Sequence, residues 1–480
     1  MTDGLRRRLA FSGQQLRNFP EWTSTHGVSQ VGRSRKWWCI GFWTIITLVA
    51  LGLLIWQIVL IFIQYYQYDV AVQIELKFEQ RTFPAVTLCD LNPYKKSIAN
   101  EYTGIERLTN AYMYTMQKLA CSSYPDCSVE TNATLEADME MYGLDQLNDT
   151  VALQTKVKRL LVLEAANYDM TSALATETDF MQGCSFNTAD CNDADWSQFE
   201  DPVMGRCFTF NRDSTRNASR AGPIYGLRVI LKTNISEYLL PSDTAGMRIL
   251  VHDQQEFPFP DIFGYNVQVG TSTSIGVTFQ EISRLGHPYG ECTDDKPDIY
   301  LYPLQYSTEG CQRSIYQTDM TTLCGCYDPA YAQPNGTDVI CQIPANYDCW
   351  NSQSNTTVTD SNCTQPCHEG VYDVTVSSAK WPSPTLTAVA DCIEGEFAQS
   401  CHEVFAQNGA LVEVYYEKLN YETMDESPAY TVSTFLSDFG GQIGLFLGMS
   451  VISAIEILVL CFQICVGCCS PKLGEAAALK

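Results

Sequence analysis

The sequence lacks the short motifs that mark common nucleotide and metalloprotease sites. GxGxxG, GxxxxGK[ST] and HExxH are all absent. The chain has five histidines, and none stands at a spacing typical of metal ligands. We therefore expect no metal, no cofactor and no enzyme activity. A membrane-anchored ectoenzyme is a distant alternative, because no set of acid, base and nucleophile can be recognised.

Basic residues are also scarce. The 480 residues include 30 Lys and Arg against 55 Asp and Glu, which gives a formal net charge of -25. Nucleic acid is therefore not an expected partner, because its phosphates would be repelled. An acidic surface can instead gather cations near a pore mouth. A hydrophobic content of 45% excludes a disordered polymer and permits a large core.

Two long apolar runs cover residues 37–65 and 433–466. Each exceeds the roughly 20 residues that cross a bilayer as a helix. Residues 1–36 carry seven Lys and Arg with little acid, so the positive-inside rule predicts a cytoplasmic amino-terminal arm. The first run is too long and begins too late for a cleaved signal peptide. The sequence therefore predicts an extracellular domain over 66–432 and a cytoplasmic tail over 467–480.

The segment between these runs carries two features of an extracellular domain. Of 21 cysteines, 16 lie between the runs, and an even number favours disulfide bonds in an oxidising compartment. All the sequons for N-glycosylation lie there as well, at Asn132, Asn148, Asn217, Asn234, Asn335, Asn355 and Asn362. Eight cysteines between residues 292 and 367 could also form a zinc site, but sequons among them favour disulfides.

The second apolar run is more polar than a simple anchor requires. Gly440, Gly444 and Gly448 recur every four residues and leave one helix face open to close packing. Ser453 and Glu456 follow at helical spacing, although a buried carboxylate costs about 3 kcal/mol on insertion scales. This pattern is typical of a pore wall. The alternative is a single-pass anchor with a glycine dimerisation face.

These residues resemble the second transmembrane segment of the degenerin, epithelial sodium channel and acid-sensing ion channel family. Residues 440–450 match its GGQxGLFxGxS-like run, and Gly448-Met449-Ser450 matches its selectivity filter. Further similar stretches are Thr25-His26-Gly27, Phe83 to Cys89 and Gly205 to Asn211. The resemblance covers nearly the whole chain.

The resemblance implies a plasma-membrane protein with two transmembrane helices around a large disulfide-rich α+β extracellular domain with a β-sheet core. It implies a homotrimer, or a heterotrimer with related subunits, that conducts sodium ions and is blocked by amiloride. The implied functional residues fall into four groups. They are the filter at Gly448, Met449 and Ser450; the cation path at Asp438, Ser453 and Glu456; the gate and amiloride region at Ser437, Gly440 and Gly441; and the gating motif His26-Gly27.

The resemblance also implies six disulfide pairs. They are Cys89–Cys207, Cys184–Cys191, Cys292–Cys367, Cys311–Cys363, Cys324–Cys349 and Cys326–Cys341. Cys121–Cys127 and Cys392–Cys401 follow by elimination. Many relatives carry one more bridge, for which Ile315 and Ser361 here occupy roughly the two positions, so no odd thiol remains.

The sequence gives fewer indications of the stimulus that would open such a channel than of its pore. Acid-sensing relatives carry a histidine pair just outside the first span, where this chain has Tyr68 and Asp69. Trp381-Pro382-Ser383 resembles invertebrate and peptide-gated members, so we favour a short amidated neuropeptide as the ligand. Proton gating, mechanical gating and constitutive opening are the alternatives. A cysteine-rich receptor or adhesion ectodomain without a pore is a distant one.

Overall fold

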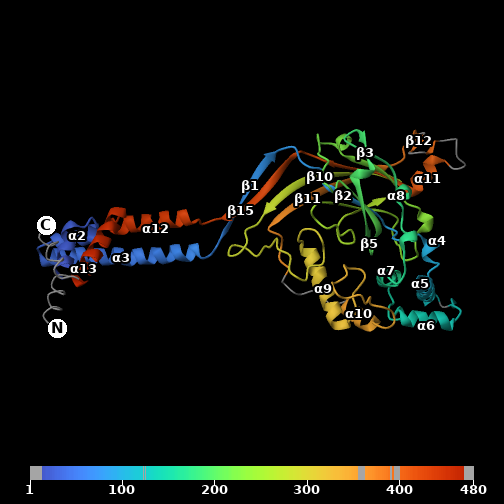
Figure 1. Ribbon diagram of the computed structural model, residues 1–480, viewed down its shortest axis with the longest axis horizontal. Coiled ribbons are helices and arrows are strands. Elements are labelled where there is room, and N and C mark those ends of the chain that lie inside the picture. Colours follow the sequence, from blue (N-terminus) through green and yellow to red (C-terminus); the bar gives the residue numbers. More distant parts are fainter. Residues whose placement is uncertain are drawn as a thin grey trace. The chain divides into compact units, whose positions relative to one another are not determined.

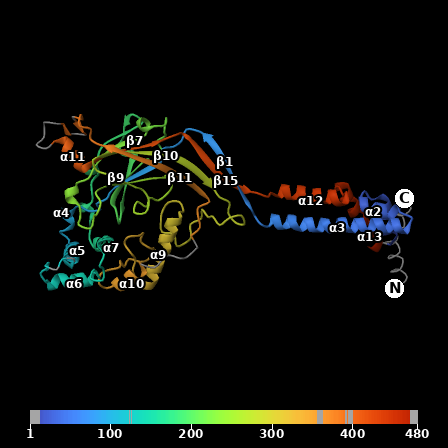
Figure 2. The same cartoon turned by 180° about the vertical axis from the view of Figure 1, so that it is seen from behind.

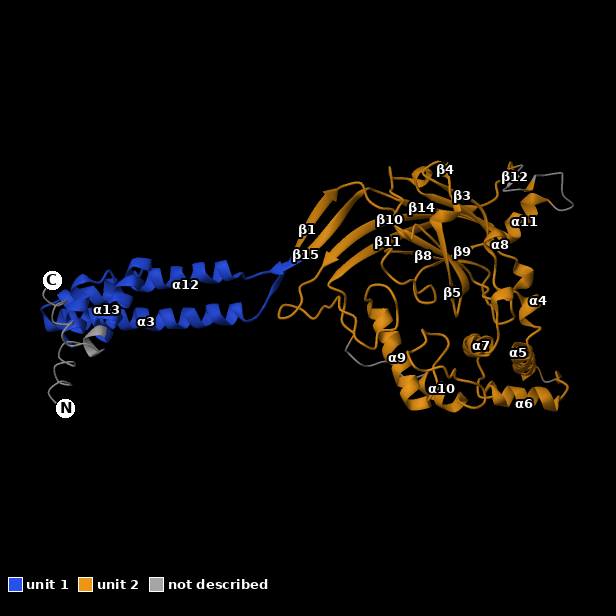
Figure 3. Cartoon of the chain, in the orientation of Figure 1, with its two compact units in different colours: residues 1–72, 426–480 blue, residues 73–425 orange. Residues whose placement is uncertain are grey.

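The computed structural model describes residues 13–122, 124, 126–354, 363–386, 388–389, 392–393 and 400–469. The chain divides into two compact units (Figure 3). Unit 1 comprises residues 1–72 and 426–480, and unit 2 comprises residues 73–425. Unit 1 contains the two apolar runs, and unit 2 contains most of the residues predicted to be extracellular.

Unit 1 is helical. Its helices include α2 (His26–Arg33), α3 (Trp37–Tyr65), α12 (Val432–Leu447) and α13 (Val451–Cys469), and residues 13–22 are also helical. Helix α3 has the bounds predicted for the first span, and it is the one described helix that is long and apolar enough to cross a membrane alone. Helices α3 and α12 lie side by side in both views (Figures 1 and 2). Phe62 of α3 contacts Phe435 of α12, with ring centroids 5.2 Å apart.

The second apolar run is not the continuous helix that we expected over 433–466. Helices α12 and α13 are separated by a break and are bent by 78°. The cause is Gly448, which takes a left-handed φ of 59° and ends α12 while its N–H bonds to the Gly444 carbonyl oxygen at 2.9 Å. The chain becomes helical again after Ser450, whose carbonyl accepts from the Ala454 N–H at 3.1 Å.

Unit 2 is built on two β-sheets. The eight-stranded sheet has the order β1-β15-β10-β14-β7-β3-β4, with β11 also paired to β10. Its strands are β1 (Val70–Phe78), β3 (Met181–Phe186), β4 (Ala189–Asp190), β7 (Leu227–Lys232), β10 (Thr271–Ser283), β11 (His368–Lys380), β14 (Gly409–Tyr416) and β15 (Asn420–Pro428). Strand β1 and β15 extend across the boundary with unit 1.

The five-stranded sheet has the order β5-β6-β2-β8-β9. Its strands are β2 (Ala85–Asp90), β5 (Trp196–Asp201), β6 (Gly205–Phe210), β8 (Gly246–His252) and β9 (Tyr265–Gln268), and a separate pair is formed by β12 (Ala388–Val389) and β13 (Cys392–Ile393). Phe83, Leu88 and Phe210 are fully buried in a core shared with residues of the larger sheet, such as Val412 and Val414. Strands β6, β7, β8 and β14 therefore all line one core.

Helices flank the sheets of unit 2 (Figure 1). They are α4 (Lys96–Ala99), α5 (Thr103–Ser122), α6 (Ala133–Met141), α7 (Thr150–Ala165), α8 (Glu177–Phe180), α9 (Thr308–Cys324), α10 (Tyr347–Gln353) and α11 (Cys401–Asn408), with short 3₁₀ turns at Thr171–Ala173, Asp193–Asp195, Pro223–Tyr225 and Ile235–Glu237. Helices α5 and α7 share a second core with Trp350 of α10. The Trp350 indole donates to the buried Asp328 at 2.7 Å, and Arg159 of α7 lies 4.9 Å above its ring.

The disulfides of unit 2 are the eight pairs expected from the sequence. The structure joins Cys89–Cys207, Cys121–Cys127, Cys184–Cys191, Cys292–Cys367, Cys311–Cys363, Cys324–Cys349, Cys326–Cys341 and Cys392–Cys401. Ile315 lies within α9, and Ser361 lies outside the described residues. Cys39, Cys461 and Cys465, in the apolar helices, are free thiols.

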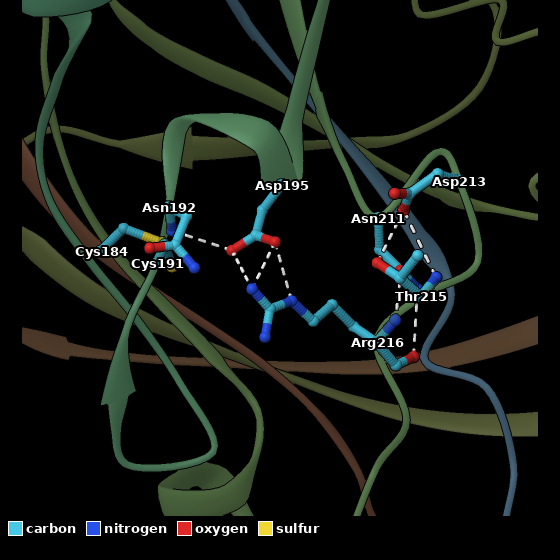
Figure 4. Close-up of polar contacts among 8 residues, drawn as sticks. All are labelled: Cys184, Cys191, Asn192, Asp195, Asn211, Asp213, Thr215 and Arg216. Carbon is cyan, nitrogen blue, oxygen red and sulfur yellow. Dashed lines mark hydrogen bonds and ion pairs between the residues drawn. A yellow bond between two sulfur atoms is a disulfide. The ribbon is translucent and has the colours of Figure 1, made fainter.

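An ion pair with a buried carboxylate joins the connection between β4 and β5 to the connection between β6 and β7 (Figure 4). Arg216 donates to both carboxylate oxygens of Asp195 at 2.7 Å, and the backbone N–H of Asn192 donates to the same carboxylate at 2.8 Å (Figure 4). Asn211 holds the Arg216 backbone through its amide oxygen at 2.8 Å. The Asp195 side chain is only 6% exposed, so the carboxylate depends on these donors for its charge.

Replacing Arg216 with Gln should destabilise the folded chain by about 3 kcal/mol, because it leaves the Asp195 carboxylate buried without a cation. Thermal unfolding of the purified full-length protein checks this. Lys158→Gln is the matched control, since Lys158 pairs with Asp243 and both side chains are 45% exposed. It should cost less than about 1 kcal/mol. Equal losses for the two variants would contradict the assignment of Asp195–Arg216 as a buried pair.

Candidate functional site

The predicted filter residues occupy the break between α12 and α13. Gly448 ends α12, Met449 follows, and Ser450 precedes α13. Residues 23–27, at the start of α2, contact this break from the amino-terminal arm. All of these residues belong to unit 1. The structure thus brings two predicted motifs, His26-Gly27 and the filter, to one place.

Two glycines are required where the arm meets the helices. A Cβ atom added at Gly448 would overlap the His26 imidazole ring, and the left-handed φ of Gly448 also favours glycine. A Cβ atom added at Gly27 would overlap the Thr47 side chain on α3. His26 is therefore packed against the backbone at the break, whereas the sequence did not indicate what this histidine would contact.

Glu456 of α13 is bonded to the arm. Its Oε2 atom accepts hydrogen bonds from the Ser24 N–H at 2.8 Å, the Ser24 hydroxyl at 3.0 Å and the Thr23 hydroxyl at 3.2 Å. Hydrogen bonds to a charged group are stronger than those between neutral groups, so three donors offset much of the desolvation of this carboxylate. Glu456 is an anchor for the arm in this structure, in addition to its predicted place on the cation path.

A second polar chain runs from the arm to Ser450. The hydroxyl groups of Ser24 and Ser453 lie 2.6 Å apart, and the Ser453 hydroxyl accepts from the Ser450 N–H at 3.0 Å. Ser453 is fully buried. Ser453 and Ser450 were predicted from the sequence, whereas Thr23 and Ser24 were not. Their signal was a run of hydroxyl residues just ahead of the His-Gly pair.

The remaining predicted residues of α12 lie away from this contact. Asp438 accepts a hydrogen bond from the Tyr430 hydroxyl at 2.5 Å. A Cβ atom added at Gly440 or Gly441 meets no other atom within 4 Å in the described part of the chain. Ser437 is exposed. Asp438 and Glu456 therefore have different partners, on opposite sides of the helix break.

The profile of the amiloride-sensitive sodium channel family matches residues 19–460. The chain belongs to this family. The match extends from the arm through both helices of the break, so it includes every residue of the site described above.

Several curated relatives are degenerins of Caenorhabditis elegans. Degenerin unc-8 is 38% identical over 353 residues, which are 68% of this chain and 44% of that protein. Degenerin-like protein asic-2 is 33% identical over 479 residues, which are 92% of this chain and 85% of that protein. Degenerin del-1 is 27% identical over 600 residues, which cover 95% of this chain and 90% of that protein. The chain thus spans less than half of unc-8 and most of asic-2 and del-1.

Among solved structures, a proton-activated chloride channel aligns over 88% of this chain and 97% of its own chain. Its sequence identity of 5% and TM-score of 0.29 are too low to inform the fold or the function.

The pKa values of three carboxyl groups of unit 2 are raised, those of the buried Asp90 and Asp201 and of the half-buried Glu256. Burial raises the pKa of Asp90 and of Asp201 to about 6. Burial, together with repulsion from Glu369 and Asp253, raises the pKa of Glu256 to about 7. Glu256 lies in a cavity of about 300 Å³ that is also lined by Arg81 and Phe279. The raised pKa values place the protonation of Asp90, Asp201 and Glu256 closer to neutral pH than that of an ordinary carboxyl group.

The predicted glycosylation sites that the structure describes lie at the surface. Among the described sequons, the asparagine side chains at Asn132, Asn148, Asn217, Asn234 and Asn335 are exposed. Asn355 and Asn362 lie outside the described residues. Within the residues that the structure describes, no group of three or more His, Cys, Asp or Glu side chains is arranged to hold a metal ion.

Replacing Glu456 with Ala should release the arm, because its three donors lose their charged acceptor. Amide hydrogen exchange over residues 23–33 of the full-length protein should become at least tenfold faster. Gln463→Ala, on the same helix, is the control and should leave that exchange unchanged. Unaltered exchange in the Glu456 variant would show that the arm is held by other contacts.

Proposed function

We propose that this chain is a subunit of a sodium-selective, amiloride-sensitive cation channel of the plasma membrane, with both termini in the cytoplasm. Membership of the amiloride-sensitive sodium channel family supports the ion and the blocker. The described part of one chain offers at most two spans, α3 and the bent pair of α12 and α13, and two spans cannot enclose a pore. Cyclic assembly supplies the wall, and we favour a trimer of identical or related subunits.

The observation that carries this proposal is the helix break at Gly448-Met449-Ser450. A break in a membrane helix leaves backbone groups without their helical partners, and such groups are tolerated where they line a water-filled path. Carbonyl and hydroxyl oxygens at a break can replace the hydration shell of a cation. We assign the selectivity filter to these three residues, and the cation path to Asp438, Ser453 and Glu456.

Contacts with the amino-terminal arm connect the proposed filter to a second segment of the chain. His26 packs on Gly448, while Ser24 and Ser453 connect the arm to Ser450. Movement of the arm would therefore change the backbone at the filter directly. We assign His26-Gly27 to gating for this reason, and we place the gate and the amiloride region at Ser437, Gly440 and Gly441.

For the trigger, we favour a short amidated peptide that binds unit 2 from outside. The resemblance at Trp381-Pro382-Ser383 supports a peptide-gated member, as does the absence of a histidine pair at Tyr68 and Asp69. Mechanical or constitutive opening would use the same filter. A panel of RFamide-type peptides applied to the expressed channel tests this choice, and silence under every peptide contradicts it.

Proton sensing is the second candidate trigger, favoured by the raised pKa of Glu256. A carboxyl group with a pKa of about 7 in this conformation and an ordinary value of 4.5 when exposed binds an extra proton between these pH values. Protons therefore stabilise the conformation seen here, and that stabilisation is lost as the pH rises through 7. Asp90 and Asp201 act in the same direction near pH 6.

The filter assignment predicts that Ser450→Cys lowers the permeability ratio of sodium to potassium, because a larger and softer atom replaces the hydroxyl. Reversal potentials under paired sodium and potassium solutions measure this ratio. Ser433→Cys is the control, since Ser433 lies in the first turn of α12, far along the chain from the break. An unchanged reversal potential for every Ser450 substitution rules out the assignment.

The pKa of Glu256 predicts that the thermal unfolding midpoint of the wild-type chain rises as the pH falls from 8 to 6. Glu256→Gln mimics the protonated carboxyl and should flatten that dependence, and it should also reduce any current evoked by acid. Glu281→Gln, on the exposed wall of the same cavity, should leave both unchanged. If Glu256→Gln keeps the wild-type pH dependence, the proton candidate loses its support.

A further inference from the structure

Tyr430 lies between β15 and α12, one residue before the helix cap. Its hydroxyl donates to Oδ2 of Asp438 at 2.5 Å. This distance is at the short end of the range for a hydroxyl bonded to a carboxylate, about 2.5 to 2.7 Å. Thr434 and Asp438 lie four residues apart on one face of α12, and Tyr430 precedes the helix cap. The phenol therefore reaches along the first turns of α12 to the carboxylate.

We propose that Tyr430 positions Asp438 and lowers the affinity of its carboxylate for divalent cations relative to sodium. This inference rests on the proposed function, in which Asp438 lies on the cation path. It adds a specificity-determining residue that our sequence analysis did not identify, since Tyr430 lies outside the helix and outside the glycine run.

The hydroxyl groups nearest to this pair have other partners. Thr431 caps α12 by accepting from the Thr434 N–H at 3.2 Å. The Thr431 hydroxyl also lies 2.8 Å from the hydroxyls of Ser433 and Thr434. Within the described part of the chain, Tyr430 is the hydrogen-bond donor found for the Asp438 side chain. Removing its hydroxyl therefore leaves no evident substitute.

The Tyr430 hydroxyl and a passing cation share the carboxylate of Asp438. The hydrogen bond occupies Oδ2 and fixes the orientation of the carboxylate, which leaves Oδ1 accessible. Calcium can bind through both oxygens of a carboxylate, and in that mode it competes with the phenol for Oδ2, whereas a sodium ion in transit can use one oxygen. The Tyr430 hydroxyl thus weakens calcium binding more than it hinders sodium.

The experiment measures block of the sodium current of the expressed full-length channel by external calcium. Tyr430→Phe removes one oxygen atom and keeps the ring. It should lower the half-blocking calcium concentration at least threefold. The same change in an Asp438→Asn background should have no effect, because the carboxylate that it frees is absent. Tyr65→Phe is the matched control, since the Tyr65 ring packs on Phe435 at 5.0 Å near the same end of α12.

The outcomes separate this inference from the proposed function. If Asp438→Asn alone leaves calcium block and reversal potential unchanged, the cation-path role of Asp438 is wrong. If Asp438→Asn shifts block but Tyr430→Phe does not, or raises the half-blocking concentration, the positioning role of Tyr430 is overturned. A Tyr430→Phe effect that persists in the Asp438→Asn background also overturns it. Where Asp438→Asn gives no current, Asp438→Glu supplies the background, since its longer side chain displaces the carboxylate.

Discussion

The described structure of unit 1 depends on one backbone constraint, the left-handed conformation of Gly448. This conformation ends α12, and the missing side chain leaves room for the His26 ring. Any other residue would face both a strained φ and an overlap with the imidazole. The bend between α12 and α13 and the docking of the arm are therefore two results of the same glycine. A single position controls both the path of the helix and the contact made by a segment more than 400 residues earlier in the chain.

The polar contacts of the arm show why an ionisable residue persists in an apolar helix. Glu456 would be costly in hydrocarbon if it were alone. The backbone and hydroxyl donors of Thr23 and Ser24 satisfy it, and the buried Ser453 extends the network toward Ser450. The carboxylate thus has a structural partner within its own chain. A function in conduction would use a group whose orientation is already fixed by hydrogen bonds.

Much of the fold could be predicted from local patterns. The uniform hydrophobicity of residues 37–65 predicted α3, and burial alternates along strands such as β7 and β14, a pattern that sequence alternation can indicate. The disulfide pairs came from family resemblance, because spacing alone allows many connectivities. The break at Gly448 was not predicted, since a glycine every four residues equally suits a continuous helix. The Ser24–Glu456 and Tyr430–Asp438 contacts depend on where separate segments meet, which periodicity does not report.

The Cys292–Cys367 bond has a further consequence for unit 2. It joins two residues 75 positions apart, just beyond the ends of the paired strands β10 and β11, and everything between them, including α9 and α10, forms a closed covalent loop. A single protease cut in this loop leaves both new ends attached through sulfur, so the fragments stay together until a reductant is added. Strands β10 and β11 would keep their register, because their pairing does not run through the severed peptide bond. A protease could therefore cut this segment without separating β10 from β11.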